Sequence, residues 1–130
     1  MPGRIMIFDD DTDLLEVCGL VLKAKSYEVF GMNHCNDVLR EVKACSPDII
    51  LMDNWIPDAG GVKAIQEIKR DSQLKNIPVI FFSANDHADA LAAESGAEFF
   101  LAKPFEIDDL ENVISKAFEF SGHTEARQTL

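Results

Sequence analysis

Basic residues are scarce in this 130-residue chain. It has 12 Lys and Arg against 23 Asp and Glu, which leaves a formal net charge of −11 at pH 7. Proteins that bind nucleic acids hold the phosphate backbone with clustered Lys and Arg, and no such cluster is available here. The charge therefore excludes nucleic acid as a partner of this chain alone.

Cysteines, targeting signals and long apolar runs are also few or absent. The cysteines, Cys18, Cys35 and Cys45, are odd in number and lack C-x-x-C spacing, which disfavours a disulfide framework or a zinc site. No apolar run approaches the ~20 residues of a membrane span, and the first apolar segment is too short for a signal peptide. We therefore expect a soluble, cytoplasmic protein with reduced thiols and no membrane contact.

The composition is that of a folded domain. Hydrophobic residues make up 47% of the chain and charged residues 27%, which is typical of globular proteins. The length suits one domain of about 100–150 residues, which can bury a core without disulfides or a structural metal. We expect the domain to occupy residues 1–120. Residues 121–130 lose the apolar stripe and predict a frayed C-terminal tail.

Short apolar runs alternate with amphipathic stretches along the chain. The runs predict strands at Ile5–Phe8, Tyr27–Phe30, Ile49–Met52, Val79–Phe82 and Phe99–Leu101. Unbroken apolar runs of about 4–8 residues indicate strands covered on both faces, as in a parallel sheet. The stretches between them repeat apolar residues at three- and four-residue intervals, which predicts helices. Five β-α units predict a three-layer α/β/α sandwich around a five-stranded parallel sheet.

Three polar residues mark predicted helix starts. Thr12, Asn36 and Asp86 lie where N-caps belong, because their side-chain oxygens can accept hydrogen bonds from the free N–H groups of a first helical turn. These positions place each helix directly after a strand or a short loop.

Polar side chains follow four of the five predicted strands. They are Asp9, Asp10 and Asp11 after the first strand, Asp53 after the third, Ser83 after the fourth and Lys103 after the fifth. The carboxyl ends of parallel strands share one edge, where ligands bind in open α/β sheets. Clustered carboxylates without His or Cys suit Mg²⁺, and an ammonium with a hydroxyl suits phosphoryl oxygens. The set predicts phosphoryl transfer with a carboxylate as the nucleophile.

Each of these residues also has an ordinary structural interpretation. An acidic run is typical of a helix N-terminus, and Asp53 alone is compatible with a turn. Taken alone, Lys103 is typical of a surface lysine, and Ser83 is typical of a helix cap. The coincidence of all of them at strand ends favours the functional interpretation.

Four motifs of the chain resemble those of the receiver domains of two-component response regulators. The motifs are Ile5–Asp10, Asp53–Pro57 with Gly61, Phe82–Ala84 and Phe100–Phe105, and the resemblance covers essentially residues 4–120. It implies a receiver domain with the flavodoxin-like strand order 2-1-3-4-5. It also implies that the protein is not an enzyme, beyond catalysing its own phosphoryl transfer and dephosphorylation.

The resemblance implies roles for the acidic residues. Asp53 corresponds to the phosphoacceptor, which receives its phosphoryl group from a histidine kinase or a phosphotransfer protein. Asp10 resembles the direct Mg²⁺ ligand, with Asp11 as the alternative if the register shifts by one residue. Asp9 resembles the acid that acts through water, and the backbone carbonyl of Trp55 would complete the coordination.

The resemblance also implies a switch. Ser83 and Lys103 match the residues that contact the phosphoryl oxygens, and Phe100 matches an aromatic residue that moves inward with that hydroxyl. The altered surface would then bind a downstream protein that the sequence does not name. The Lys103–Pro104 bond resembles one that is cis in the family.

Two positions are predicted to set the lifetime of the phosphoryl group. Trp55 and Asn85 lie two residues past Asp53 and Ser83, where receiver domains control the access of water. Trp55 is bulky for this position, so we expect it to cover the acyl phosphate and slow its hydrolysis. The alternative for its side chain is an ordinary surface aromatic.

Two rival interpretations use the same residues. Asp9-x-Asp11 after an apolar strand resembles the haloacid dehalogenase phosphatases, with Asp9 as nucleophile, but Asp13 stands where Thr or Val is expected. The chain is also short for the larger core and cap of those enzymes. A receiver-like scaffold that binds partners without phosphorylation is the second rival. Its usual signature is the loss of an acid or of the lysine, and neither is lost here.

Overall fold

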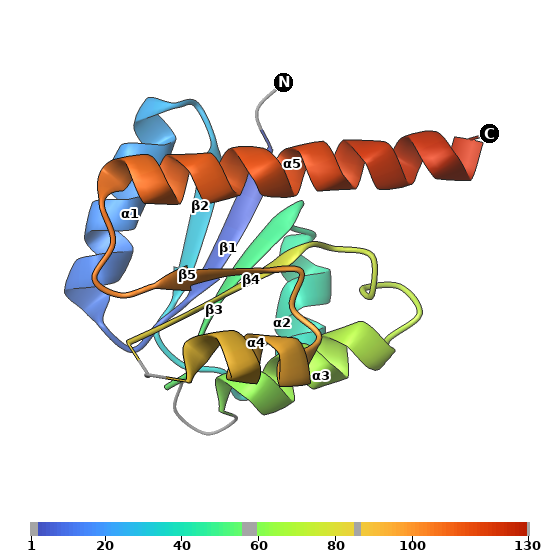
Figure 1. Ribbon diagram of the computed structural model, residues 1–130, viewed down its shortest axis with the longest axis horizontal. Coiled ribbons are helices and arrows are strands. Elements are labelled where there is room, and N and C mark those ends of the chain that lie inside the picture. The colour runs from blue at the N-terminus through green and yellow to red at the C-terminus, as the bar shows by residue number, and fades with distance from the viewer. Residues whose placement is uncertain (1–2, 56–59, 85–86, 130) are drawn as a thin grey trace.

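The computed structural model describes residues 3–55, 60–84 and 87–129, and strands and helices alternate along these segments (Figure 1). The strands are β1 (Arg4–Phe8), β2 (Glu28–Met32), β3 (Ile49–Asp53), β4 (Val79–Ser83) and β5 (Phe99–Ala102). The helices are α1 (Thr12–Ala24), α2 (Val38–Cys45), α3 (Gly61–Arg70), α4 (Ala88–Ser95) and α5 (Ile107–Thr129).

The strands form one parallel sheet in the order β2-β1-β3-β4-β5. Helices α1 and α5 pack on one face of this sheet, and α2, α3 and α4 pack on the other. Figure 1 shows α5 above the sheet, with α3 and α4 below it. The predicted fold class, a flavodoxin-like three-layer sandwich, is confirmed.

The central strands are buried because both faces of the sheet are covered. Every residue of β3 and of β4 is buried, in keeping with their continuous apolar sequences. Successive side chains of a strand point to opposite faces, so neighbours enter different cores. Phe81 packs in the core beneath α2, α3 and α4, whereas Phe82 packs in the core beneath α1 and α5. Both rings are completely buried.

Two helices begin under a different cap from the predicted one. Asp11 caps α1 in place of Thr12, and Asp37 caps α2 in place of Asn36. The carboxylate of Asp11 accepts two hydrogen bonds from N–H groups of the first turn and that of Asp37 accepts one. Each negative charge also interacts favourably with the positive end of the helix dipole. The third predicted cap, Asp86, lies outside the described residues.

Helix α5 is longer than the sequence predicts. The frayed tail expected from residue 121 is instead continuous helix to Thr129. Once a helix is nucleated, each added residue gains a backbone hydrogen bond. The helix can therefore continue beyond the last apolar residues that pack on the sheet. The division into a domain of residues 1–120 and a tail stays a prediction. Within the described segments, no helix combines the length and the apolar character needed to cross a membrane.

Helix α3 starts in close contact with the end of β3. The N–H of Gly61 donates to the carbonyl of Asn54 at 3.1 Å. A Cβ atom added to Gly61 would overlap the backbone carbonyl oxygen of Asp53. Glycine is therefore required here because no side chain fits between the helix and the strand end that carries Asp53.

We predict that Gly61→Ala destabilises the protein by about 1–3 kcal/mol, the usual cost of forcing extra atoms into a packed site. The matched control is Gly19→Ala within α1, where an added Cβ meets nothing within 4 Å. Alanine should stabilise that position by about 0.5–1 kcal/mol. Urea denaturation followed by circular dichroism measures both free energies of unfolding, and equal effects of the two substitutions would contradict the close contact.

Candidate functional site

The carboxyl ends of four strands converge at one edge of the sheet. Asp9 follows β1, Asp53 ends β3, Ser83 ends β4 and Lys103 follows β5. Parallel pairing places Asp53 beside Phe82 and Ser83 beside Ala102, which aligns these ends. The topology thus gathers residues that are far apart in the sequence.

A lysine bridges two buried carboxylates at this edge. The Nζ atom of Lys103 donates to Oδ2 of Asp9 at 2.8 Å and to Oδ1 of Asp53 at 3.0 Å. Asp9 is completely buried and Asp53 is 4% exposed. Buried charges are costly unless they are paired and hydrogen-bonded, so the ammonium makes this arrangement possible.

Backbone N–H groups fix the orientation of both carboxylates. The remaining oxygen of Asp9, Oδ1, accepts a hydrogen bond from the N–H of Asp11 at 2.9 Å. The remaining oxygen of Asp53, Oδ2, accepts one from the N–H of Trp55 at 3.1 Å. Each carboxylate therefore presents one oxygen to Lys103 and the other to the loop that follows its own strand.

Lys103 is itself held by β4. Its backbone N–H donates to the carbonyl of Ser83 at 3.0 Å. Its ammonium lies over the ring of Phe82, 4.7 Å from the ring centroid. The peptide bond between Lys103 and Pro104 is cis, which the resemblance implies.

Burial changes the acidity of the cluster. Burial raises the pKa of Asp53 to about 6, although the hydrogen bond from Lys103 opposes the rise. Burial likewise raises the pKa of Asp9. For Lys103, burial lowers the pKa, but the hydrogen bonds to Asp9 and Asp53 more than offset this and leave it raised. The lysine therefore stays charged. The hydrogen bonds from Lys103 offset only part of the free energy that burial adds to ionising Asp9 and Asp53.

The acidic cluster fits a hard divalent cation. One carboxylate oxygen from each of Asp9, Asp10 and Asp53 lies within 4.8 Å of the others. The set contains oxygen ligands alone, which Mg²⁺ prefers. When all three carboxylates are ionised, the ammonium of Lys103 leaves two negative charges uncompensated, and a divalent cation would balance them.

The other predicted site residues differ in their placement. Ser83 is buried at the end of β4, whereas Phe100 on β5 is 46% exposed. Trp55 contacts the cluster through its backbone N–H, but its side chain is largely in solvent, since the residue is 76% exposed. Asn85 lies outside the described residues.

Sequence reasoning does not identify the ring beneath the lysine. Phe81 and Phe82 are both buried in β4 and have the same local pattern, yet only Phe82 belongs to the core on the α1 and α5 side. The usable signal is strand alternation, which separates the two rings. Strand alternation does not predict which of the two rings the side chain of Lys103 contacts.

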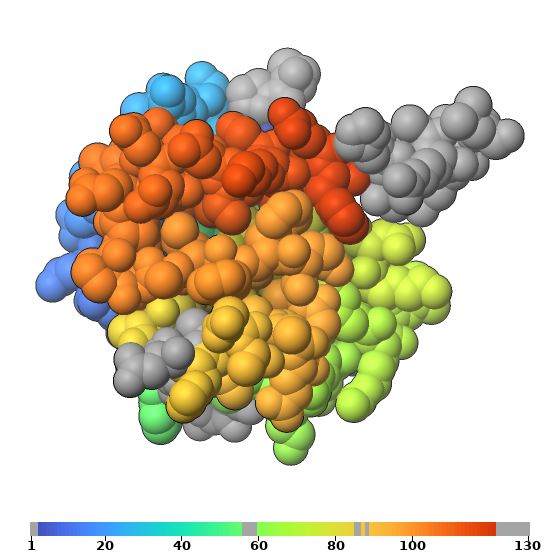
Figure 2. Space-filling view, viewed as in Figure 1, coloured from blue at the N-terminus to red at the C-terminus, as the bar shows by residue number. Residues whose placement is uncertain are grey.

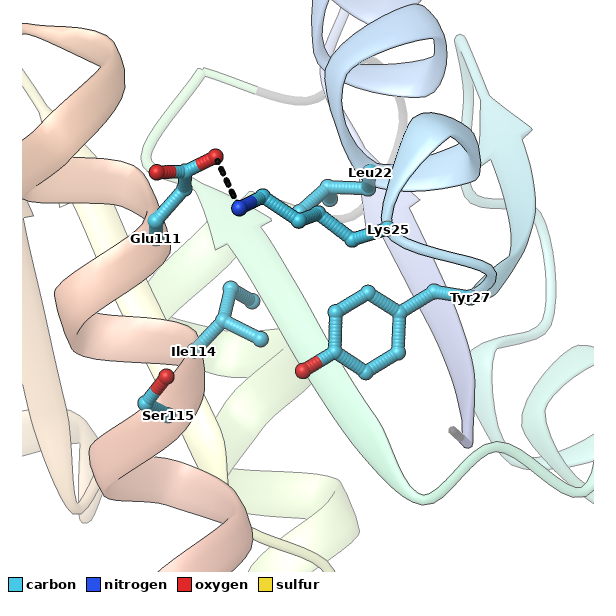
Figure 3. Close-up of a pocket in the computed structure, with 6 residues that line it drawn as sticks. All are labelled: Leu22, Lys25, Tyr27, Glu111, Ile114 and Ser115. Atoms are coloured by element: carbon cyan, nitrogen blue, oxygen red, sulfur yellow. Dashed lines mark ion pairs between the residues drawn. The ribbon is translucent and has the colours of Figure 1, made fainter. Parts of the chain in front are cut away.

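A pocket of about 190 Å³ lies apart from the cluster, between the end of α1 and the middle of α5 (Figure 3). Its lining consists of Leu22, Lys25, Tyr27, Glu111, Ile114 and Ser115. Lys25 and Glu111 form an ion pair of 3.6 Å beside it, and the ring of Tyr27 stacks on Phe118 with centroids 5.3 Å apart. None of the acidic cluster residues lines this pocket, so it is no part of the site.

Known proteins share this arrangement. The family model for the response regulator receiver domain matches residues 5–115. The sensory transduction protein BceR of Halalkalibacterium halodurans is 32% identical over 109 residues, which cover 82% of this chain and 46% of that protein. This chain therefore spans less than half of that relative.

Solved structures agree in fold. A CheY-like response regulator receiver domain protein from Methanospirillum hungatei superposes with a TM-score of 0.81 at 22% identity, over 95% of this chain and 99% of that one. The signal receiver domain of a histidine kinase from Syntrophus aciditrophicus gives a TM-score of 0.82 at 23% identity, over 90% of each chain. At such identities these structures support the fold alone.

We predict that Asp53→Asn stabilises the metal-free protein by up to about 3 kcal/mol at pH 8, since a pKa raised from 3.8 to about 6 makes the ionised carboxylate costly in the folded state. Wild-type stability is highest below the unfolded pKa and falls as the pH rises through the folded pKa. The increase in the free energy of unfolding caused by Asp53→Asn should therefore be smaller at pH 5 than at pH 8. Urea denaturation in EDTA measures it.

The control for this substitution is Glu119→Gln, which removes an exposed carboxylate of α5 and should change stability by less than about 0.5 kcal/mol at either pH. An Asp53→Asn protein that is less stable than wild type at pH 8 would contradict the cost assigned to the buried charge.

Proposed function

This chain belongs to the response regulator receiver domain family, and we propose that it accepts a phosphoryl group on Asp53 from a histidine kinase or a phosphotransfer protein. Members of the family serve two-component signalling and are not conventional enzymes. The observation that carries the proposal is the ammonium of Lys103 bridging buried Asp9 and Asp53 at the ends of their strands.

The proposed reaction follows from the contacts of Asp53. A carboxylate oxygen of Asp53 attacks phosphorus and forms an O–P bond, while the P–N bond of the donor phosphohistidine breaks and its electron pair stays on the imidazole. Lys103, which already contacts Oδ1 of Asp53, would bind a phosphoryl oxygen. Asp9, Asp10 and Asp53 would hold Mg²⁺, which when bound neutralises the charge of the phosphoryl oxygens. The backbone carbonyl of Trp55 would complete its ligands.

The transferred group would act on a nearby surface. Ser83 ends β4 beside Ala102 of β5, so a shift of Ser83 toward a phosphoryl oxygen pulls on the edge strand. Exposed Phe100 lines a hollow of about 450 Å³ between β5 and α5, and the proposed switch would turn its ring inward. Figure 2 shows α4, β5 and α5 forming one continuous face of the molecule. We assign this face to the downstream protein.

The cysteines of this chain are unpaired and compatible with a reducing location. Cys18, Cys35 and Cys45 are all free, and the first two are buried. Burial raises the pKa of Cys18 to about 11 and that of Cys35 to about 12, so both thiols stay protonated and unreactive. We place the chain in the cytoplasm on the strength of the receiver family, because a histidine kinase would present its phosphoryl group there.

The rival nucleophile is Asp9. It is as deeply buried as Asp53 and shares the same lysine, so contacts alone do not separate the two carboxylates. Membership of the receiver family favours Asp53, since the motif resemblance assigns Asp53 to the acceptor position and Asp9 to the metal site. The scaffold interpretation uses the same fold but needs no phosphoryl transfer.

We predict that acetyl phosphate with Mg²⁺ modifies the protein at Asp53, and that Asp53→Asn abolishes the modification. Peptide mass spectrometry locates the adduct after reduction with borohydride. Omitting Mg²⁺ is the control and should stop the reaction. An adduct on Asp9 would support the phosphatase interpretation, and the absence of any adduct together with unchanged partner binding by Asp53→Asn would support the scaffold.

We predict that Trp55→Ala speeds loss of the phosphoryl group, because the indole would limit the access of water. The increase should stay below about tenfold, a barrier change of ~1.4 kcal/mol, since Trp55 is 76% exposed and covers the site incompletely. The decay of radiolabelled protein measures the rate. Leu20→Ala, which removes an exposed side chain of α1, is the control. Equal decay in wild type and Trp55→Ala would contradict the shielding role.

A further inference from the structure

Among the described residues, the ammonium of Lys103 contacts two carboxylates and one aromatic ring. The carboxylates are those of Asp9 and Asp53, at 2.8 and 3.0 Å. The ring is that of Phe82, whose centroid lies 4.7 Å from Nζ. A cation over an aromatic face is attracted by the negative charge density of the ring, most strongly where water is excluded.

We propose that Phe82 is a positioning residue, which holds the Lys103 ammonium in place for phosphoryl transfer. This inference rests on the proposed function of Asp53 as phosphoacceptor. It adds a contact that acts through the lysine and touches neither the phosphoryl group nor the metal.

The carboxylate contacts of Lys103 cannot serve this purpose throughout the reaction. Asp9 and Asp53 are also the groups that would bind Mg²⁺, and Asp53 would become an acyl phosphate. Both events draw their oxygens away from the ammonium or remove their negative charge. The ring of Phe82 takes part in neither event, so its attraction for the ammonium remains while the carboxylates change partners.

The position of the ring is fixed by the sheet. Phe82 is completely buried in β4, between β3 and β5, and pairs in register with Asp53 on one side and Leu101 on the other. Its carbonyl accepts a hydrogen bond from the N–H of Asn54 at 3.3 Å. The ring is therefore tied to the strand end that carries the acceptor and to the strand that leads to Lys103.

An aromatic ring suits this role better than a further carboxylate. Lys103 reaches the site on a flexible four-carbon stem, which needs support to keep the ammonium in one place. A third carboxylate beside it would compete with the phosphoryl oxygens for the same donors. A ring attracts the cation without adding a hydrogen-bond acceptor of comparable strength, and so leaves the N–H groups available.

The adjacent residue supplies a matched control. Phe81 is the same residue type on the same strand and is equally buried, but it packs in the opposite core. Phe81→Leu and Phe82→Leu remove the same atoms from equivalent depths of the sheet. A merely structural role predicts similar losses of stability and similar effects on the site from the two substitutions.

The experiment measures phosphorylation of full-length wild type, Phe81→Leu and Phe82→Leu by acetyl phosphate at saturating Mg²⁺, with Mg²⁺ affinity from calorimetry. Phe82→Leu should slow labelling of Asp53 about three- to tenfold, the size expected for a buried cation–π contact. Mg²⁺ affinity should be unchanged. Phe81→Leu should label within about twofold of wild type after both variants are shown to be folded.

A second measurement does not depend on phosphorylation. Ring currents of Phe82 should move the NMR resonances of the Lys103 side chain upfield in wild type and in Phe81→Leu, and Phe82→Leu should abolish the shift. If Phe82→Leu fails to fold, Phe82→Met, whose flexible unbranched side chain adapts better to a space shaped for a ring, takes its place in both measurements.

The outcomes separate this inference from the proposed function. Normal labelling by Phe82→Leu, or equal slowing by both variants, overturns the positioning role and leaves the acceptor assignment intact. Failure of wild type and Phe81→Leu to label at Asp53 overturns the proposed function and, with it, the catalytic use of the ring. Unshifted Lys103 resonances in wild type overturn the contact itself.

Discussion

The structure of this site depends on one ammonium group shared between two buried carboxylates. Asp9 and Asp53 come from different strands, and Lys103 comes from the far end of the chain, so the contacts at 2.8 and 3.0 Å close only when the whole sheet has formed. Without the lysine, two like charges would face each other in a site that water barely reaches. With the lysine in place, the two carboxylates remain buried and oriented. One ammonium does not neutralise both of them, so the site can still bind a cation.

The surrounding fold is built to hold those groups at close range. Gly61 lets α3 start against the carbonyl of Asp53, where no side chain fits. The loops after β1 and β3 each return an N–H group to the carboxylate of their own strand, from Asp11 and Trp55. These are short-range constraints of packing and hydrogen bonding, yet together they decide which oxygen of each carboxylate is available for chemistry. Because burial makes the ionised carboxylates costly, the site favours a bound cation.

Chemistry and surface are connected through β4 and β5. The end of β4 carries Ser83 and holds the backbone N–H of Lys103, and the paired edge strand β5 carries exposed Phe100. The proposed change of charge at Asp53 would act through β4 on β5, which is an edge strand paired on one side only. The match to the receiver domain family covers both of these strands and, among the helices, all but the C-terminal part of α5.

Local sequence was enough to determine the alternation of elements, the parallel sheet and the placement of Asp9, Asp53 and Lys103 at one edge, because period and topology restrict where strand ends can lie. Caps were misplaced by one residue, since neighbouring Asp, Asn and Thr are all competent and small differences in geometry choose among them. The end of α5 was also missed, because helix can extend past its apolar stripe. Only the tertiary structure decided that Lys103 lies over Phe82, since two adjacent phenylalanines look alike in sequence and the approach of a lysine from another strand is set by long-range packing.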